Sequence, residues 1–342
     1  MTFLRVVISI VLVTATAPLL AQEIPRATPE SVGLSTAGLQ RATSALQAHI
    51  DAGDIGGVVA AVARDGKLVY SEALGYRDVV TQDPMAPDTL FRQYSMTRSI
   101  TSLAAMILWE EGRLALDDPI SKYLPQFANQ AVFVDSSAPD MERTRARSGD
   151  ITIEQLHTHT SGLGSRSSDI YRAESVRLRS ISVEEMVDNA ARVPLFEDPG
   201  TRFRYGISTT ILGRVVEVVS GMPLEEFFEK RIFQPLGMTD TVFWVGAARA
   251  ARLATVYRPS PDGELRPHAI EDVPFTERPP LIEGGVGLLS TVPDYVRLSQ
   301  MFLNRGELDG QRVLRPETVD MMTANRIPDE LLPLFGRDNG YG

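Results

Sequence analysis

Two apolar runs near the start of the chain predict a β-hairpin. They are GGVVAAVA and KLVYSEAL, joined at Asp65-Gly66, and an Asp-Gly pair between such runs is a strong hairpin signal. Ahead of the hairpin we predict a helix, capped by Ser35 and stopped near Gly53. Its apolar side chains recur at helical spacing: Leu39, Ala42, Leu46 and Ile50.

Helical patterns dominate the middle of the chain, from residue 113 to about residue 270. Thr152 with Gln155 reads as a capping box, as does Ser182 with Glu185. Residues 208–219 carry apolar side chains at helical spacing and stop at Gly221. Near the end, EGGVGLLSTVPDYVRLSQMFLN predicts a Gly-rich turn, a short strand and a helix.

This order of elements predicts an α+β domain with a mostly helical insertion. Residues 22–112 and about 271–342 would form its α/β part, and residues 113 to about 270 its helical part. Few strands are visible, and the ending GRDNGYG contains neither a helix stop nor a closing strand. We therefore expect the missing core strands to lie beyond Gly342, which would leave the domain incomplete at its C-terminus.

Residues 1–21 have the features of a signal peptide. Arg5 supplies a positive charge, VVISIVLV is a short apolar stretch, and Ala21 is a plausible cleavage point. A membrane anchor is the alternative reading, but about 16 mostly apolar residues fall short of the roughly 20 that a spanning helix needs. We expect an exported protein, periplasmic or secreted, with no stable membrane anchor after cleavage.

Composition narrows the chemistry. The net charge of -10 argues against nucleic acid as a partner. The 342 residues include no cysteine, which excludes disulfides and a thiol nucleophile. The sequence does not determine the oligomeric state.

The string FRQYSMTRSITSLAAMILWEEGRLALDDPISKYLP, residues 91–125, holds the strongest chemical signal. Ser95 stands where an extended segment turns into an apolar helix, and Arg98 shares its helix face. A helix N-terminus favours a developing oxyanion, so Ser95 is a candidate nucleophile; an ordinary N-cap serine is the alternative. Arg98 can hold positive charge and donate hydrogen bonds, but it cannot act as a general base.

The base must therefore lie elsewhere, and Tyr205 in PGTRFRYGISTTILG is the candidate. A fixed guanidinium beside a phenol favours the phenolate, which could take the Ser95 proton. The four histidines, His49, His157, His159 and His268, offer a rival base, and His157 and His159 form a His-x-His pair. As metal ligands they lack a third partner at readable spacing, so we expect no metal.

Two long polar loops, residues 128–150 and 164–180, favour a surface location over a role at a substrate cleft. We interpret their arginines as solvated charges that balance an acidic surface. These are Arg143, Arg145, Arg147, Arg166, Arg172, Arg177 and Arg179.

Together these strings resemble the beta-lactamase-related serine hydrolases, and within them the class C beta-lactamase-like esterases called family VIII carboxylesterases. The markers run from about Pro29 to Gly342. They are SMTRSITSLAAMILWEEGRLALDDPISKYLP, ITIEQLHTHTSGL, PGTRFRYGISTTILGRVVEVVSG, RIFQPLGMTDT and GGVGLLSTVPDYVRL. The resemblance implies a beta-lactamase/transpeptidase-like fold, with an antiparallel sheet flanked by helices.

The resemblance also implies roles. Ser95 matches the acylated serine, Arg98 the position usually held by lysine, and Tyr205 the tyrosine of the Y-x-N motif. Ile207 replaces the asparagine that contacts a lactam amide, which favours an ester substrate. A third motif, K-T-G, H-x-G or W-G-G, does not occur in this sequence.

We therefore expect an exported serine hydrolase that forms an acyl-Ser95 intermediate with a small ester and uses no metal or organic cofactor. Two alternatives stay open. One is a D-amino-acid peptidase or weak beta-lactamase acting on cell-wall-like amides. The other is a non-catalytic binder that keeps the fold.

Overall fold

The computed structural model describes residues 23–269 and 275–331. The predicted signal peptide, residues 1–21, and the GRDNGYG ending lie outside the described residues. Within the described part, no helix has both the length and the apolar character needed to cross a membrane.

The predicted hairpin is confirmed. β1 (Gly57–Arg64) and β2 (Lys67–Asp78) pair antiparallel, with Arg64 opposite Lys67. Asp65 and Gly66 both have positive φ, 51° and 72°, as a two-residue type I′ turn requires. β3 (Asp83–Pro84) pairs with β2, and the sheet order is β1-β2-β3.

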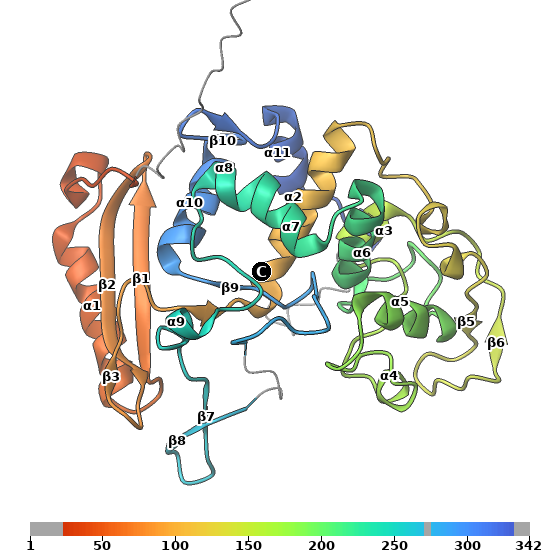
Figure 1. Cartoon of the computed structure of the whole chain (residues 1–342), viewed down its shortest axis with the longest axis horizontal. Coiled ribbons are helices and arrows are strands. Elements are labelled where there is room, and N and C mark those ends of the chain that lie inside the picture. Colours follow the sequence, from red (N-terminus) through yellow and green to blue (C-terminus); the bar gives the residue numbers. More distant parts are fainter. Residues whose placement is uncertain (1–22, 270–274, 332–342) are drawn as a thin grey trace, which may run out of the picture.

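Helices flank this small sheet (Figure 1). α1 (Thr36–Asp51) begins at its predicted cap, because Ser35 Oγ accepts the Gly38 N–H at 3.2 Å, and it packs on β2. α10 (Val292–Leu303) lies on the β1 side. Among the described residues β1 pairs only with β2, so its other edge carries no strand.

The centre of the molecule is α2 (Thr97–Glu110), which packs against α6 (Ser208–Ser220). α6 ends at the predicted Gly221, with a φ of 73°. The capping box at Thr152 opens α3 (Ile153–His157), and Ser182 caps α5 (Val183–Arg192). The other described α-helices are α4 (Asp169–Ala173), α7 (Leu224–Phe228), α8 (Gln234–Leu236), α9 (Ala247–Ala250) and α11 (Pro316–Thr323), with a π-helical turn at Glu229–Phe233. Short 3₁₀ helices lie at Pro29–Val32, Ile120–Lys122 and Pro125–Phe127.

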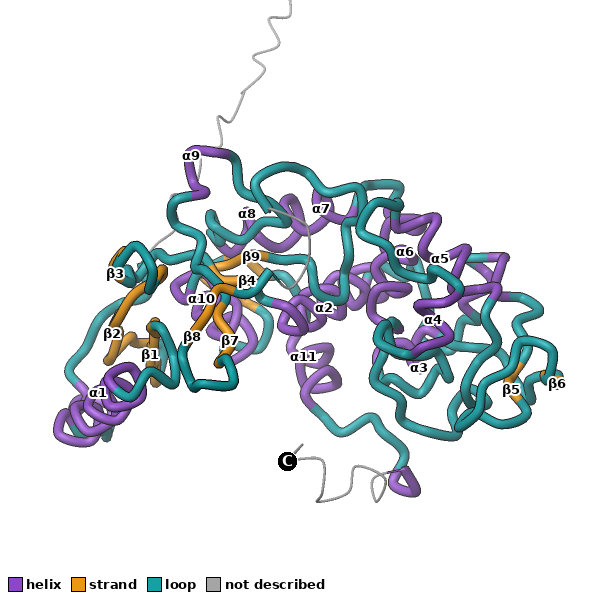
Figure 2. The backbone as a smooth tube through the Cα atoms, turned by 90° about the horizontal axis from the view of Figure 1, so that it is seen from below, coloured by secondary structure: helices purple, strands orange, loops and turns teal. Residues whose placement is uncertain are grey.

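A short antiparallel ladder joins distant parts of the sequence. β4 (Phe91–Arg92) pairs with β9 (Leu289–Ser290), and the two lie side by side near the start of α2 (Figure 2). This ladder brings the residues before Ser95 next to the EGGVG segment. The remaining described strands form three small hairpins: β5 (Val132–Phe133) with β6 (Thr144–Arg145), β7 (Tyr257–Pro259) with β8 (Leu265–Pro267), and β10 (Glu307–Leu308) with β11 (Gln311–Arg312).

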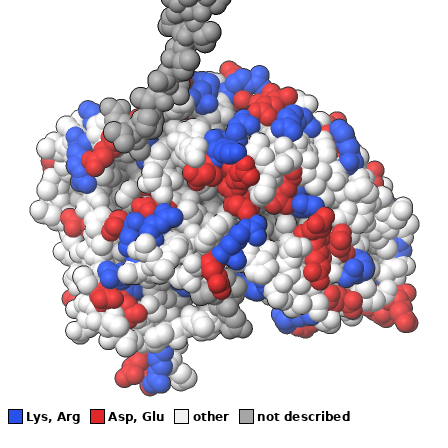
Figure 3. All heavy atoms as spheres, viewed as in Figure 1, with Lys and Arg blue, Asp and Glu red and all other residues white. Residues whose placement is uncertain are grey.

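The α+β class is confirmed, with antiparallel strand pairs among helices. One large apolar core surrounds α2, and a small second cluster lies beneath β4 and β9. On the face drawn in Figure 3, acidic and basic side chains are interspersed. The boundaries at residues 112 and 270 stay a prediction.

Candidate active site

Ser95 lies in a single 3₁₀ turn, Tyr94–Met96, between β4 and α2. The turn is anchored through Gln93, whose N–H donates to the Leu288 carbonyl at 2.8 Å. Tyr94 has a φ of 44°, a conformation that costs a non-glycine residue energy and is often found at functional sites. The backbone before Ser95 is thus held by the pairing of β4 with β9, and the backbone after it by α2.

The alternative of an N-cap serine is wrong in detail. The N-cap of α2 is Met96, one residue later, and no side chain caps this helix end. Among the described residues the Ser95 hydroxyl has no hydrogen-bond partner, and Ser95 is exposed. Its hydroxyl is therefore not used to cap α2 and faces solvent.

Arg98 points from the first turn of α2 toward the start of α6. Its Nη1 donates to the Gly206 carbonyl at 3.0 Å and to Thr209 Oγ1 at 3.1 Å. Its guanidinium carbon lies 4.4 Å from the centre of the Tyr205 ring. Burial lowers the pKa of Arg98, while Tyr205 and Glu283 act in the opposite direction. Arg98 remains a cation at any pH where the fold survives.

Tyr205 is half-exposed at 45%, so a substrate can reach it. Gly206 holds it in place. A Cβ on Gly206 would lie 2.2 Å from the carbonyl oxygen of Gly164, so only glycine permits this approach of two backbones. The structure therefore brings Arg98 and Tyr205 into contact, with Ser95 in the 3₁₀ turn that leads into α2.

The two histidines near this pair are poor bases. The His159 ring lies 4.8 Å from the Tyr205 ring, between centroids. Burial first, and then the charge of Arg98, lower the pKa of His159 to about 3. Burial lowers the pKa of His157 to about 4. Both imidazoles are neutral at physiological pH and bind protons weakly, so His159 touches the site without the basicity that the rival reading needs.

The interpretation of the loop arginines as solvated charges is wrong for Arg147, Arg177 and Arg179. The Arg147 side chain is 9% exposed and donates to the carbonyls of Phe127 at 2.7 Å and Ala128 at 2.8 Å. The Arg177 Nε donates to both carboxylate oxygens of Glu283, at 3.0 and 2.8 Å, and Arg179 lies 3.8 Å from the same carboxylate. Glu283 is 2% exposed. The physical reason is that a buried carboxylate needs cationic partners, and this loop supplies them.

Glu283 was not singled out from the sequence, although it stands in the quoted EGGVG string. Thr210 of α6 also donates to it at 3.3 Å. Gly285 lets the segment after Glu283 lie close to both α6 and Arg98. A Cβ on Gly285 would lie 2.5 Å from Thr210 Oγ1 and 3.8 Å from the Arg98 guanidinium. A glutamate beside a Gly-Gly turn was the signal that could have found it.

The candidate site offers little to a metal. Within residues 23–269 and 275–331, no three His, Cys, Asp or Glu side chains gather as a metal site would require. What the arrangement can do is hold a fixed positive charge against a reachable phenol, close to an exposed serine.

The chain is similar to known proteins over most of its length. The chain matches the model of the Beta-lactamase family over residues 42–342. An uncharacterized protein of Mycobacterium tuberculosis is 40% identical over 283 residues, 82% of this chain and 70% of that protein. Lovastatin esterase of Penicillium rubens is 34% identical over 298 residues, 83% of this chain and 72% of that protein. The structure of EstCE1, titled a hydrolase with promiscuous acyltransferase activity, has a TM-score of 0.72 at 29% identity, covering 82% of this chain and 75% of its own. The chain therefore belongs to the beta-lactamase family of serine hydrolases.

Proposed function

We propose that the protein is an exported serine hydrolase that acts on small esters through an acyl-Ser95 intermediate. The observation that carries the proposal is the Arg98 guanidinium, 4.4 Å from the Tyr205 ring centre and one turn after Ser95. The esterase relative and the hydrolase EstCE1 support the reaction class.

In the proposed reaction, Ser95 Oγ attacks the ester carbonyl while Tyr205, as phenolate, takes the serine proton. The tetrahedral intermediate then collapses. The bond to the alkoxy oxygen breaks, and Tyr205 returns the proton to the departing alcohol. Water then attacks the acyl-Ser95 ester while Tyr205 accepts a proton from it. The bond between the acyl carbon and Ser95 Oγ breaks, Tyr205 returns the proton to Ser95 Oγ, and the acid is released. The Ser95 backbone N–H supplies one donor to the oxyanion.

We assign the role of general base to Tyr205 because its neighbours Arg98, His159 and Glu283 are each unsuited to accept the Ser95 proton. Arg98 cannot give up its proton. His159 has a pKa of about 3. Glu283 is buried and held by Arg177. Among the described residues around Arg98, Tyr205 is the one that is exposed and lies against this fixed cation.

An ester is favoured over a lactam by the residue two positions after Tyr205. Ile207 is 2% exposed, so its side chain belongs to the core and presents no polar group to a lactam amide. The family relatives that act on esters support the same preference.

The decisive test is Ser95→Ala with Ser99→Ala as its matched control. Ser99 is an exposed serine one turn further along α2, hydrogen-bonded to Tyr295 at 3.0 Å. We expect Ser95→Ala to abolish both turnover of a short-chain nitrophenyl ester and labelling by a fluorophosphonate, whereas Ser99→Ala keeps both. Normal turnover in Ser95→Ala would refute the nucleophile assignment. A wild-type chain that neither labels nor turns over esters or lactams would favour the non-catalytic binder.

Export rests on residues 1–21 alone. If it occurs with the predicted cleavage, the N-terminus of the mature protein should be Gln22, recovered from the periplasm or medium. A cytoplasmic protein that retains residues 1–21 would contradict this part of the proposal.

A further inference from the structure

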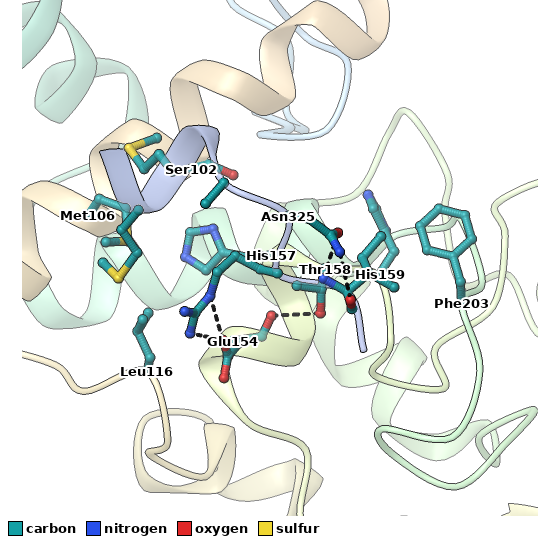
Figure 4. Close-up of a pocket in the computed structure, with 14 residues that line it drawn as sticks. Ser102, Met106, Leu116, Glu154, His157, Thr158, His159, Phe203 and Asn325 are labelled. Carbon is teal, nitrogen blue, oxygen red and sulfur yellow. Dashed lines mark hydrogen bonds and ion pairs between the residues drawn. The ribbon is translucent and has the colours of Figure 1, made fainter. Parts of the chain in front are cut away.

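A cavity of about 320 Å³ lies beside the candidate active site, between α2, the end of α3 and the segment that follows α11 (Figure 4). Its volume falls within the range of small-molecule sites. α2 contributes Ser102 and Met106, and α11 contributes Met321 and Met322. Ser95, Arg98 and Tyr205 do not line it, so the cavity is separate from the proposed catalytic centre.

Two histidines give this cavity its polar character, and we call it the histidine pocket. Figure 4 shows the His157 ring on the side nearer Met106 and the His159 ring on the side nearer Phe203. Among the described residues, the enclosed nitrogens His157 Nε2 and His159 Nδ1 have no hydrogen-bond partner. Enclosed polar groups without a partner are costly and call for an explanation, which a bound molecule can provide.

The remaining walls restrict what such a molecule can be. They are mainly apolar, formed by Met106, Leu116, Phe203 and Ile327 among others. The charges at the rim already pair with each other, since Arg326 Nε donates to Glu154 at 3.1 Å. Both imidazoles are neutral at physiological pH. A charged ligand would be buried here without a counter-charge, which is unfavourable.

We propose that the histidine pocket binds a small neutral alcohol or phenol, with its apolar body against the methionines and its hydroxyl on an imidazole. A neutral imidazole carries one acceptor and one donor nitrogen, so a hydroxyl can pair with either. The bound molecule would lie against His159, whose ring also lies 4.8 Å from the Tyr205 ring and 5.9 Å from the Phe203 ring, between centroids. The inference stands apart from the proposed esterase activity, because no catalytic residue lines the pocket.

The test uses benzyl alcohol as the probe and toluene as the probe that lacks the hydroxyl. Each is titrated into the full chain, and the histidine ring signals are followed by two-bond ¹H–¹⁵N NMR. We expect benzyl alcohol to shift the signals of His157 and His159 in a saturable way, and toluene to bind several-fold more weakly. The ring of His49, 64% exposed and paired with Asp54, should not respond and serves as the internal control.

Variants then locate the binding. Ala324→Trp places an indole at the exposed rim of the pocket and should weaken benzyl alcohol binding at least tenfold. Leu303→Trp adds the same indole at a residue that is 71% exposed and does not line the pocket, and it should leave binding unchanged. Should Ala324→Trp fail to fold, Ile327→Trp on the same rim repeats the test. Unchanged histidine signals up to the solubility of the probe, or equal binding by the rim variant and Leu303→Trp, would overturn the proposal.

Discussion

Replacing Arg98 by methionine removes the fixed positive charge beside Tyr205 while keeping a side chain of similar length. Two unit charges about 4 Å apart attract by about 1 kcal/mol in water and about 4 kcal/mol at an effective dielectric constant near 20. Tyr205 is half-exposed, so the loss should lie within these limits. Since about 1.4 kcal/mol is a tenfold change in rate, we expect kcat for Arg98→Met to fall roughly tenfold to a few hundredfold.

Arg98→Lys keeps the positive charge but replaces the planar guanidinium, which donates in several fixed directions, by a compact ammonium group. It can retain a bond to either the Gly206 carbonyl or Thr209 Oγ1, but not the full set of contacts that arginine makes. We expect kcat within about tenfold of the wild type at neutral pH, because roughly 1 kcal/mol of positioning is lost. At alkaline pH the gap should close or reverse, because an unprotonated lysine is a general base.

The assay is kcat and KM for a nitrophenyl butyrate ester from pH 6 to pH 10, with urea unfolding of each variant to separate activity from stability. Arg41→Met, which removes an arginine from the exposed side of α1, is the matched control and should behave as wild type. If the Lys and Met variants have equal activity, the charge at position 98 is irrelevant and the proposed role of Arg98 is refuted.

Four further outcomes test the site. Tyr205→Phe should lower kcat at least a hundredfold with little change in KM, since a general base acts in the transition state; near-normal kcat would remove Tyr205 from the mechanism. Gly206→Ala should lower kcat tenfold or more, because its Cβ would lie 2.2 Å from the Gly164 carbonyl oxygen, whereas Gly246→Ala meets no atom within 4 Å and should be silent. Glu283→Gln should lower the free energy of unfolding by about 3–5 kcal/mol by breaking a buried ion pair, and a loss below 1 kcal/mol in urea would show that Arg177 readily finds solvent. Burial holds the pKa of His157 near 4 rather than 6.5, so His157 takes up a proton in the unfolded chain before it does so in the folded one as the pH falls. The free energy of unfolding should therefore drop by at most about 1.4 kcal/mol per pH unit between pH 6 and pH 4. If the free energy of unfolding of His157→Gln depends on pH as steeply as that of the wild type, His157 does not contribute.

Local signals in the sequence predicted local structure well. The Asp65-Gly66 turn, the Ser35 cap and the Gly221 stop appear where the sequence placed them. Each of these features depends on interactions within a few residues, such as a positive φ or a side-chain oxygen on the first turn of a helix. The family resemblance added Ser95, Arg98 and Tyr205 as one set, and the structure brings the last two of them together.

Long-range pairing could not be predicted in the same way. Arg177 and Glu283 are 106 residues apart, and neither carries a local sign that it will be buried. A loop arginine is ordinarily solvated, and only the fold decides that this one meets a carboxylate of the EGGVG segment. The same holds for Gly206 and Gly164, whose close approach depends on how α6 enters the core. The sequence therefore indicated the chemical groups but not the contacts that hold them.

These contacts explain why arginine is compatible with the position where the family usually carries lysine. A lysine can exchange its proton, whereas the guanidinium of Arg98 makes three contacts with a single segment: the Tyr205 ring, the Gly206 carbonyl and Thr209 Oγ1. Those contacts tie the start of α6 to the start of α2. A lysine at position 98 could transfer a proton, whereas we propose that Arg98 positions its neighbours. Its fixed charge lies against the ring of Tyr205, which is half-exposed. In the proposed reaction the proton chemistry of Ser95 consequently depends on Tyr205, and the contacts of Arg98 hold the segment that carries Tyr205 in place.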